Sequence, residues 1–105
     1  MRDDVRLARQ ATRALLPINR RIGEFQAVAA RIRGAALHMD PSLKARVRLQ
    51  IADLDRQIAA QWQQLRDEIG ALPDEAREHS RVHDTQRALS SLEIAVAETR
   101  RLLGD

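Results

Sequence analysis

The sequence predicts an all-α fold, an antiparallel bundle of three long helices in a single domain covering residues 1–105. Three observations lead to this class. Ala, Leu, Arg, Gln and Glu dominate the composition, and these are good helix formers. Apolar residues recur every three to four positions, the period of a helix with one buried face. Proline and glycine occur where such helices would begin and end, and only two residues are aromatic, which is few for a strand-rich domain.

The first predicted helix covers residues 3–38 and contains Pro17, a residue type that normally kinks or breaks a helix. The apolar period continues through the proline without a change of phase, whereas a loop would normally reset it. We therefore expect one helix that is kinked at Pro17. The alternative is a break at Pro17, which would give a bundle of four helices. The apolar positions of this segment are Ala8, Ala11, Leu15, Ile18, Ile22, Phe25, Ala29, Ile32 and Ala36.

The second predicted helix covers residues 41–70 and begins at an Asp40-Pro41 pair. Asp is a favoured N-cap residue, and Pro is well suited to the first helical position. The apolar residues that follow are spaced 4-4-3-4-4-3-4, an eleven-residue repeat that predicts a nearly straight helix. They are Leu43, Val47, Ile51, Leu54, Ile58, Trp62, Leu65 and Ile69.

The third predicted helix covers residues 73–103 and follows Gly70, which we expect to cap the end of the second helix. Val82, Leu89, Val96 and Leu103 recur at seven-residue spacing, as in a heptad seam. The seam also includes Thr85, Leu92 and Thr99, although Leu would pack better than Thr. The stretch from residue 75 to 87 is markedly polar, so we expect the first turns to pack loosely or to lie exposed.

The net charge of +3 is unevenly divided between the two halves of the chain. Residues 1–50 carry ten Arg and one Lys against four acids, a net of +7, and residues 51–105 carry a net of −4. The simpler interpretation is that the basic helix lies against the acidic ones within one molecule. The other is a basic surface for an anionic partner.

Basic residues form two candidate anion-binding or nucleic-acid-binding features. One is a stripe of arginines along a face of the first helix, made of Arg2, Arg6, Arg9, Arg13 and Arg20. The other flanks the first turn between helices and includes Arg31, Arg33, Lys44 and Arg48. Both features suit contacts with phosphates. No DNA-recognition motif or set of stacking aromatics accompanies them, so a solvated basic face is the simpler interpretation.

A row of small residues lies beside the main apolar face of the first helix, at Gly23, Ala27, Ala30 and Gly34. Glycine inside a helix costs about 1 kcal/mol relative to alanine, so two glycines in one row suggest that another backbone approaches closely. The approaching element is either a second helix of the same bundle or a partner, in which case the row is a docking groove or a dimer seam.

Catalytic and metal-binding patterns are weak in this sequence. The absence of Cys excludes disulfides and thiolate metal sites. Glu75, His79 and His83 recur at four-residue steps, but two His and one acid make an incomplete zinc site, so a solvated polar face is the simpler interpretation. No phosphate-binding glycine loop or nucleophile elbow is present. We therefore expect no enzyme activity, no metal and no cofactor.

These patterns together favour a non-enzymatic interaction module, such as an adaptor, a small chaperone or a regulator. Its long amphipathic helices and surplus apolar positions suit a protein partner and possible self-association as a homodimer. The alternative is a nucleic-acid-associated protein that uses the basic first helix. Neither a membrane-spanning apolar run nor the apolar core of a signal peptide occurs, so a cytoplasmic location without membrane association is the default expectation.

Overall fold

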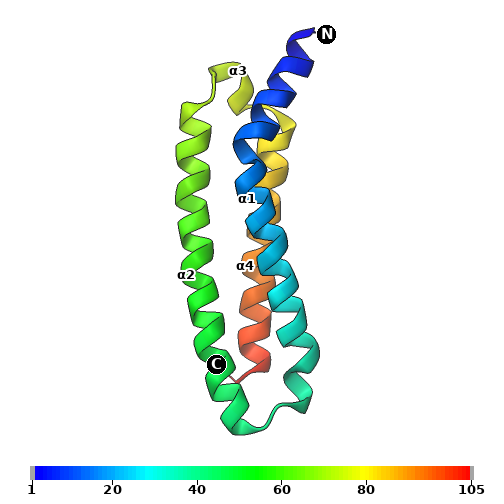
Figure 1. The fold of residues 1–105 in the computed structure, drawn as a ribbon, viewed down its shortest axis with the longest axis vertical. Coiled ribbons are helices and arrows are strands. Elements are labelled where there is room, and N and C mark those ends of the chain that lie inside the picture. The colour runs from blue at the N-terminus through cyan, green and yellow to red at the C-terminus, as the bar shows by residue number, and fades with distance from the viewer. Residues whose placement is uncertain (1, 105) are drawn as a thin grey trace.

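Three long helices extend along the molecule, and two short elements complete the fold of the described chain (Figure 1). The computed structural model describes residues 2–104, with side chains from residue 4 onward. The elements are α1 (Arg2–Ala35), the 3₁₀ turn η1 (Ala36–His38), α2 (Pro41–Ala71), α3 (Asp74–Arg77) and α4 (Ser80–Leu102). The predicted all-α bundle is therefore confirmed.

Short connections determine the directions of the helices. Only residues 39 and 40 separate η1 from α2, so α2 turns back along α1, and α4 then runs parallel to α1 (Figure 1). The bundle is a rod that measures 56 × 21 × 16 Å. Of the pairs of helices, α1 and α4 pack most extensively, and α2 contacts both of them.

Helix α1 is continuous through Pro17, so the alternative with a break at Pro17 is wrong. Figure 1 shows that the ribbon changes direction in the part of α1 that includes Pro17. Pro17 lies on the exposed side of the helix, where water can bond the carbonyl group that lacks a backbone N–H partner. The core-facing residues on both sides keep their helical spacing, which is why the helix persists.

One core extends through the bundle and uses most of the apolar positions that the periods predict, although Leu43 at the start of α2 is 39% exposed. Every predicted position from Ala11 in α1 to Ala36 in η1 is buried. The heptad seam of α4 and the following Leu103 are also buried, both threonines included. Thr85 donates to Asn19 Oδ1 across to α1 at 2.9 Å, and Thr99 donates to the Ala95 carbonyl at 2.8 Å. The hydroxyl groups thus keep partners inside the core, as buried polar groups require.

The expected single helix 73–103 is wrong in its first turns. The chain forms the one-turn helix α3, then a break at Glu78 and His79, and His79 caps α4 by accepting the Arg81 N–H at 3.1 Å. The expectation that these turns lie exposed holds for most of their side chains, but the apolar ones pack into the core: Ala76 and Val82 are 0% and 1% exposed. The break lets the polar segment turn while its few apolar side chains reach the core.

The sequence predicts the capping residue correctly at the start of α2 but not at its end. Asp40 accepts the Leu43 N–H at 2.8 Å, and Pro41 follows as the first residue, so the predicted N-cap is confirmed. The expected cap by Gly70 is wrong, because Gly70 lies inside α2 and has no positive φ. The helix ends at Ala71, with Leu72 as its cap residue.

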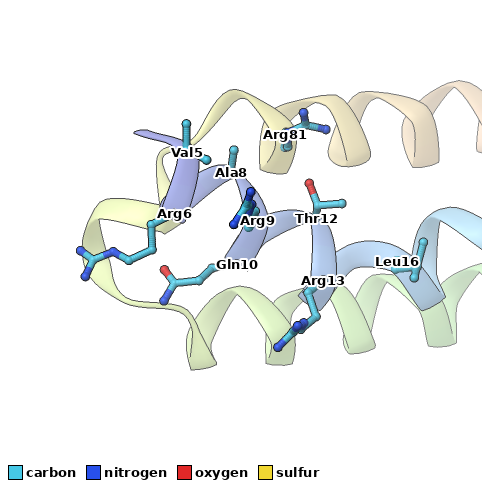
Figure 2. A pocket seen from close by; sticks show the side chains of 9 residues that line it. All are labelled: Val5, Arg6, Ala8, Arg9, Gln10, Thr12, Arg13, Leu16 and Arg81. Carbon is cyan, nitrogen blue, oxygen red and sulfur yellow. The ribbon is translucent and has the colours of Figure 1, made fainter. Parts of the chain in front are cut away.

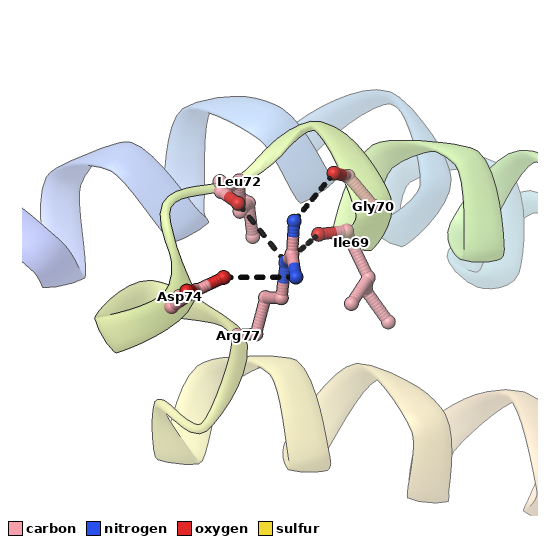
Figure 3. A network of polar contacts seen from close by, with 5 residues as sticks. All are labelled: Ile69, Gly70, Leu72, Asp74 and Arg77. Atoms are coloured by element: carbon pink, nitrogen blue, oxygen red, sulfur yellow. Dashed lines mark hydrogen bonds and ion pairs between the residues drawn. The ribbon is translucent and has the colours of Figure 1, made fainter.

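Arg77 of α3 binds the end of α2 instead (Figure 3). Its Nε donates to the Ile69 and Leu72 carbonyls at 3.1 and 3.0 Å, and its Nη2 donates to the Gly70 carbonyl at 2.8 Å. Its Nη1 lies 2.9 Å from Asp74 Oδ1. The last carbonyls of a helix lack partners within it, and a cation is favourable at this negative end. One guanidinium therefore joins α2 to α3.

Candidate interaction surface

The small-residue row faces solvent along α1. Gly23, Ala27, Ala30 and Gly34 are all exposed. A Cβ atom placed on either Gly23 or Gly34 would meet nothing within 4 Å apart from the helix's own backbone. The interpretation as a close contact with another helix of the same bundle is therefore wrong, because α2 and α4 pack against the opposite side of α1.

Replacing Gly23 with Ala is expected to raise the free energy of unfolding by about 0.5–1 kcal/mol. Ala loses less backbone entropy than Gly in a helix interior, and the space around Gly23 is open. Thermal and urea unfolding of the isolated protein measures the change. A loss of stability would mean that the site is more crowded than the structure shows, and Ala27→Gly is the reverse control, expected to destabilise by a similar amount.

The row belongs to a longer outer face of α1, which we define as Val5, Thr12, Leu16, Gly23, Ala27, Ala30 and Gly34. Six of its seven members are related by steps of eleven residues, from Val5 through Leu16 to Ala27 and from Thr12 through Gly23 to Gly34. Eleven residues make three helical turns and return to nearly the same side of a helix. Val5 and Leu16 are 53% and 51% exposed, so this face carries large apolar side chains that the bundle does not cover.

An open groove of about 1250 Å³ follows the first half of the outer face. Figure 2 shows Val5, Ala8, Thr12 and Leu16 pointing toward the side on which Arg81 of α4 lies. Arg6, Gln10 and Arg13 lie on the opposite side of α1, and Arg9 lies between the two sets. The groove thus has an apolar floor between basic rims.

Three arginines of the predicted stripe are available for a partner. Arg9, Arg13 and Arg20 are exposed and form no ion pair with any residue whose side chain is described. Arg9 and Arg13 line the groove, and Arg20 lines a neighbouring hollow of about 430 Å³ beside Pro17. Arg6 also lines the groove and has an interaction within the molecule. Arg2 belongs to the same predicted stripe, but its side chain lies outside the described residues.

The predicted basic cluster at the first turn is partly used inside the bundle. Arg33 pairs with Glu98 of α4 at 3.2 Å, and the Arg48 Nε donates to the Leu103 carbonyl at 2.7 Å. Arg31 is exposed, Lys44 is half-buried, and neither forms an ion pair with the described residues. Two of the four cations therefore connect helices, which weakens the cluster as an anion-binding site.

Arg33 of α1 pairs with Glu98 of α4, which joins the basic half of the chain to the acidic half. Arg100 with Asp55 joins α4 to α2, and both of these residues belong to the acidic half. Arg9 and Arg13, which line the groove, form no such ion pair with the described residues. The interpretation that the basic helix lies against the acidic ones thus applies to the Arg33 end of α1, while the N-terminal half presents positive charge to solvent.

The residues Glu75, His79 and His83 do not share one helix face, because the break between α3 and α4 falls among them. His79 uses its Nδ1 atom for the cap of α4, and the His83 Nε2 lies 4.0 Å from Glu78. Within residues 4–104, no group of three or more His, Asp or Glu side chains is placed to hold a metal ion.

Sequence patterns identified only part of this surface. Leu16 is not among the predicted apolar positions of the first helix, and its connection with Val5 and Ala27 follows only once α1 is known to be continuous. The eleven-residue spacing is the signal that could have found it. Arg81 had no such signal, because its position beside α1 depends on how α4 begins after the break at His79.

No helix in the described part of the chain is both long enough and apolar enough to span a membrane. Comparison with protein-family models, with curated proteins and with solved structures finds nothing that matches the chain.

Proposed function

We propose that this protein is a non-enzymatic helical interaction module that binds a protein partner along the outer face of α1. The observation that carries the proposal is the exposure of an apolar and small-residue stripe on a helix whose opposite face is fully packed. Val5 and Leu16 supply exposed apolar area, and the row from Gly23 to Gly34 supplies a flat backbone surface. Small residues allow another helix to approach closely, and uncovered apolar patches mark interaction sites.

The non-enzymatic part of the proposal is supported by the residues around the groove. Its lining consists of apolar side chains, four arginines, one Gln and one Thr, with no carboxylate or imidazole to act as a general base. Such a lining binds and orients a partner but offers no proton-transfer pair.

Site-specific photo-crosslinking in the cells that produce the protein tests this proposal. A photoreactive residue in place of Ala27 is expected to give a discrete covalent adduct with another protein, because Ala27 lies at the middle of the exposed row. The same residue in place of Ala59, exposed on α2, is the matched control. The proposal is wrong if positions on the outer face give no adduct, or only adducts that Ala59 gives equally.

Self-association is the form of the proposal in which the partner is a second copy. Sedimentation velocity between about 5 and 500 µM measures it directly. A dimer that dissociates in the Ala27→Glu variant, while that variant stays folded by circular dichroism, would place the homodimer on this face. A strict monomer over the whole range would leave a different protein as the partner.

A second candidate function is association with nucleic acid, favoured by the exposure of Arg9, Arg13 and Arg20, which form no ion pair with the described side chains. Such binding weakens steeply with salt, because each neutralised phosphate releases counterions. Fluorescence polarisation with duplex and single-stranded oligonucleotides at several salt concentrations tests it. Replacing the three arginines with Gln is expected to reduce both the affinity and the salt slope, and unchanged affinity would exclude this stripe as the binding site.

A further inference from the structure

We infer that the groove at the N-terminal half of α1 binds an acidic amphipathic helix of another protein. This inference rests on the proposed function and specifies the chemistry of its partner. The groove combines an apolar floor of Val5, Ala8 and Leu16 with exposed cations on both sides of that floor. A matching ligand must present apolar side chains flanked by negative charge, which is the pattern of an amphipathic helix with Asp and Glu beside its apolar stripe.

The shape of the groove fits a helix. The floor residues Val5, Ala8, Thr12 and Leu16 follow steps of three, four and four residues, so their side chains form one row along α1. This row extends eleven residues, or about 16 Å at the rise of an α-helix, which corresponds to three turns of a partner helix packed alongside. The groove is open and its volume of about 1250 Å³ exceeds the usual range of about 300–1,000 Å³ for small-molecule pockets.

The arrangement of charge decides which sign the partner carries. Arg13 lies on one side of the floor and Arg81 lies on the other, with Arg9 between them (Figure 2). Arg9 and Arg13 lack ion pairs among the residues with described side chains, so acids of a partner would not have to displace internal ones. A helix of this protein's own basic type would instead meet like charge, which disfavours α1 of a second copy at this place.

The apolar floor favours a peptide over a nucleic acid. A phosphate backbone would use the arginines but would leave Val5 and Leu16 without apolar contacts. The stacking of bases needs exposed aromatic rings, and the chain has only Phe25, which is buried in α1, and Trp62, which is half-buried on α2. An acidic helix uses both the floor and the cations.

Fluorescence anisotropy with a synthetic peptide tests the inference on the whole protein. The probe is a labelled helical peptide of 18 residues with Leu along one face, Glu on both flanks of that face and Gln elsewhere. We expect saturable binding with a Kd of about 1–100 µM, the range of modest peptide–groove affinities. A peptide with Lys in place of every Glu, and one with Ser in place of every Leu, are both expected to bind at least tenfold more weakly.

Variants of the protein locate the binding. The double variant Arg9→Glu with Arg13→Glu is expected to reduce the affinity at least tenfold and to abolish most of its salt dependence. The matched control is Arg66→Glu with Arg101→Glu, which makes the same change in charge at exposed positions outside the groove and is expected to bind like the unmodified protein. Leu16→Ala is expected to weaken binding several-fold while leaving the salt dependence intact. All three are surface changes, and circular dichroism verifies their folding.

The outcomes separate this inference from the proposed function. Equal peptide affinity in the groove double variant and its control would overturn the inference, as would binding of an oligonucleotide but not of the peptide. Adducts from Ala27 in the crosslinking experiment, combined with no peptide binding at the groove, would retain the interaction module and reject the acidic helix. Absence of adducts along the whole outer face would remove the proposed function itself, even if the synthetic peptide bound.

Discussion

Replacing Leu89 with Ala is expected to lower the free energy of unfolding by about 2–5 kcal/mol. Leu89 is 0% exposed and lies midway along the heptad seam of α4, which packs more extensively on α1 than α2 does. Removal of its buried methyl and methylene groups loses their transfer free energy and leaves a cavity that a rod of three helices closes only in part. Domains of this size are stable by about 5–15 kcal/mol, so the loss is a large fraction of the total.

Urea unfolding followed by the fluorescence of Trp62 measures this effect. The Trp62 ring is half-buried on α2 and its Nε1 donates to Glu93 of α4, so its environment changes when the two helices separate. Ile94→Ala is the matched control, because Ile94 lies on the same helix and is 61% exposed. We expect it to change stability by less than about 0.5 kcal/mol. Equal losses in the two variants would show that α4 does not bury the face described here.

Replacing Arg77 with Ala is expected to cost about 1–2 kcal/mol. Hydrogen bonds to charged groups contribute about 1.5–3 kcal/mol, and the Arg77 side chain is 41% exposed, which favours the lower part of that range. The variant leaves the carbonyls of Ile69, Gly70 and Leu72 without their guanidinium donor. The turn between α2 and α3 should therefore fray, with faster amide exchange in residues 72–79.

Two controls separate the hydrogen bonds of Arg77 from its charge. Asp74→Ala removes only the ion pair, in which the Asp74 side chain is 89% exposed, and is expected to cost less than about 0.5 kcal/mol. Arg77→Lys keeps the charge near the end of α2 but lacks the fork of donors, so it should lose most of what Arg77→Ala loses. If the Lys variant were as stable as the original protein, the dipole interaction and not the bonding would hold this turn.

Most of the core could be predicted from the sequence because burial in a helix leaves a periodic record. The seam from Val82 to Leu103 and the eleven-residue repeat of α2 each indicate one face. The structure buries the whole seam and most of the α2 face, whose first position, Leu43, is 39% exposed. Caps made by neighbouring residues are also predictable, as Asp40 shows. The capping of the C-terminal end of α2 could not be predicted. Its carbonyl groups accept hydrogen bonds from Arg77, and the position of Arg77 depends on the break between α3 and α4.

The candidate surface likewise has features that the sequence predicts and features that depend on the tertiary structure. The row from Gly23 to Gly34 and the stripe containing Arg9 and Arg13 are visible in the sequence, because both follow the helical period. The pattern alone left open whether the row packed inside the bundle, because small residues serve equally well against a partner or a neighbouring helix. The groove needs Arg81, and nothing in the local sequence places Arg81 beside α1.

Helical periodicity, a proline after a capping aspartate and short connections were enough to determine the class of fold, the order of the long helices and most residues of the core. These features act between residues that are close in the chain, so a linear pattern records them. Which sides of α1 are covered, how Pro17 is accommodated and where α4 begins depend on contacts between segments distant in sequence. Only the tertiary structure decided that the outer face of α1 remains uncovered, because that outcome depends on where two other helices pack.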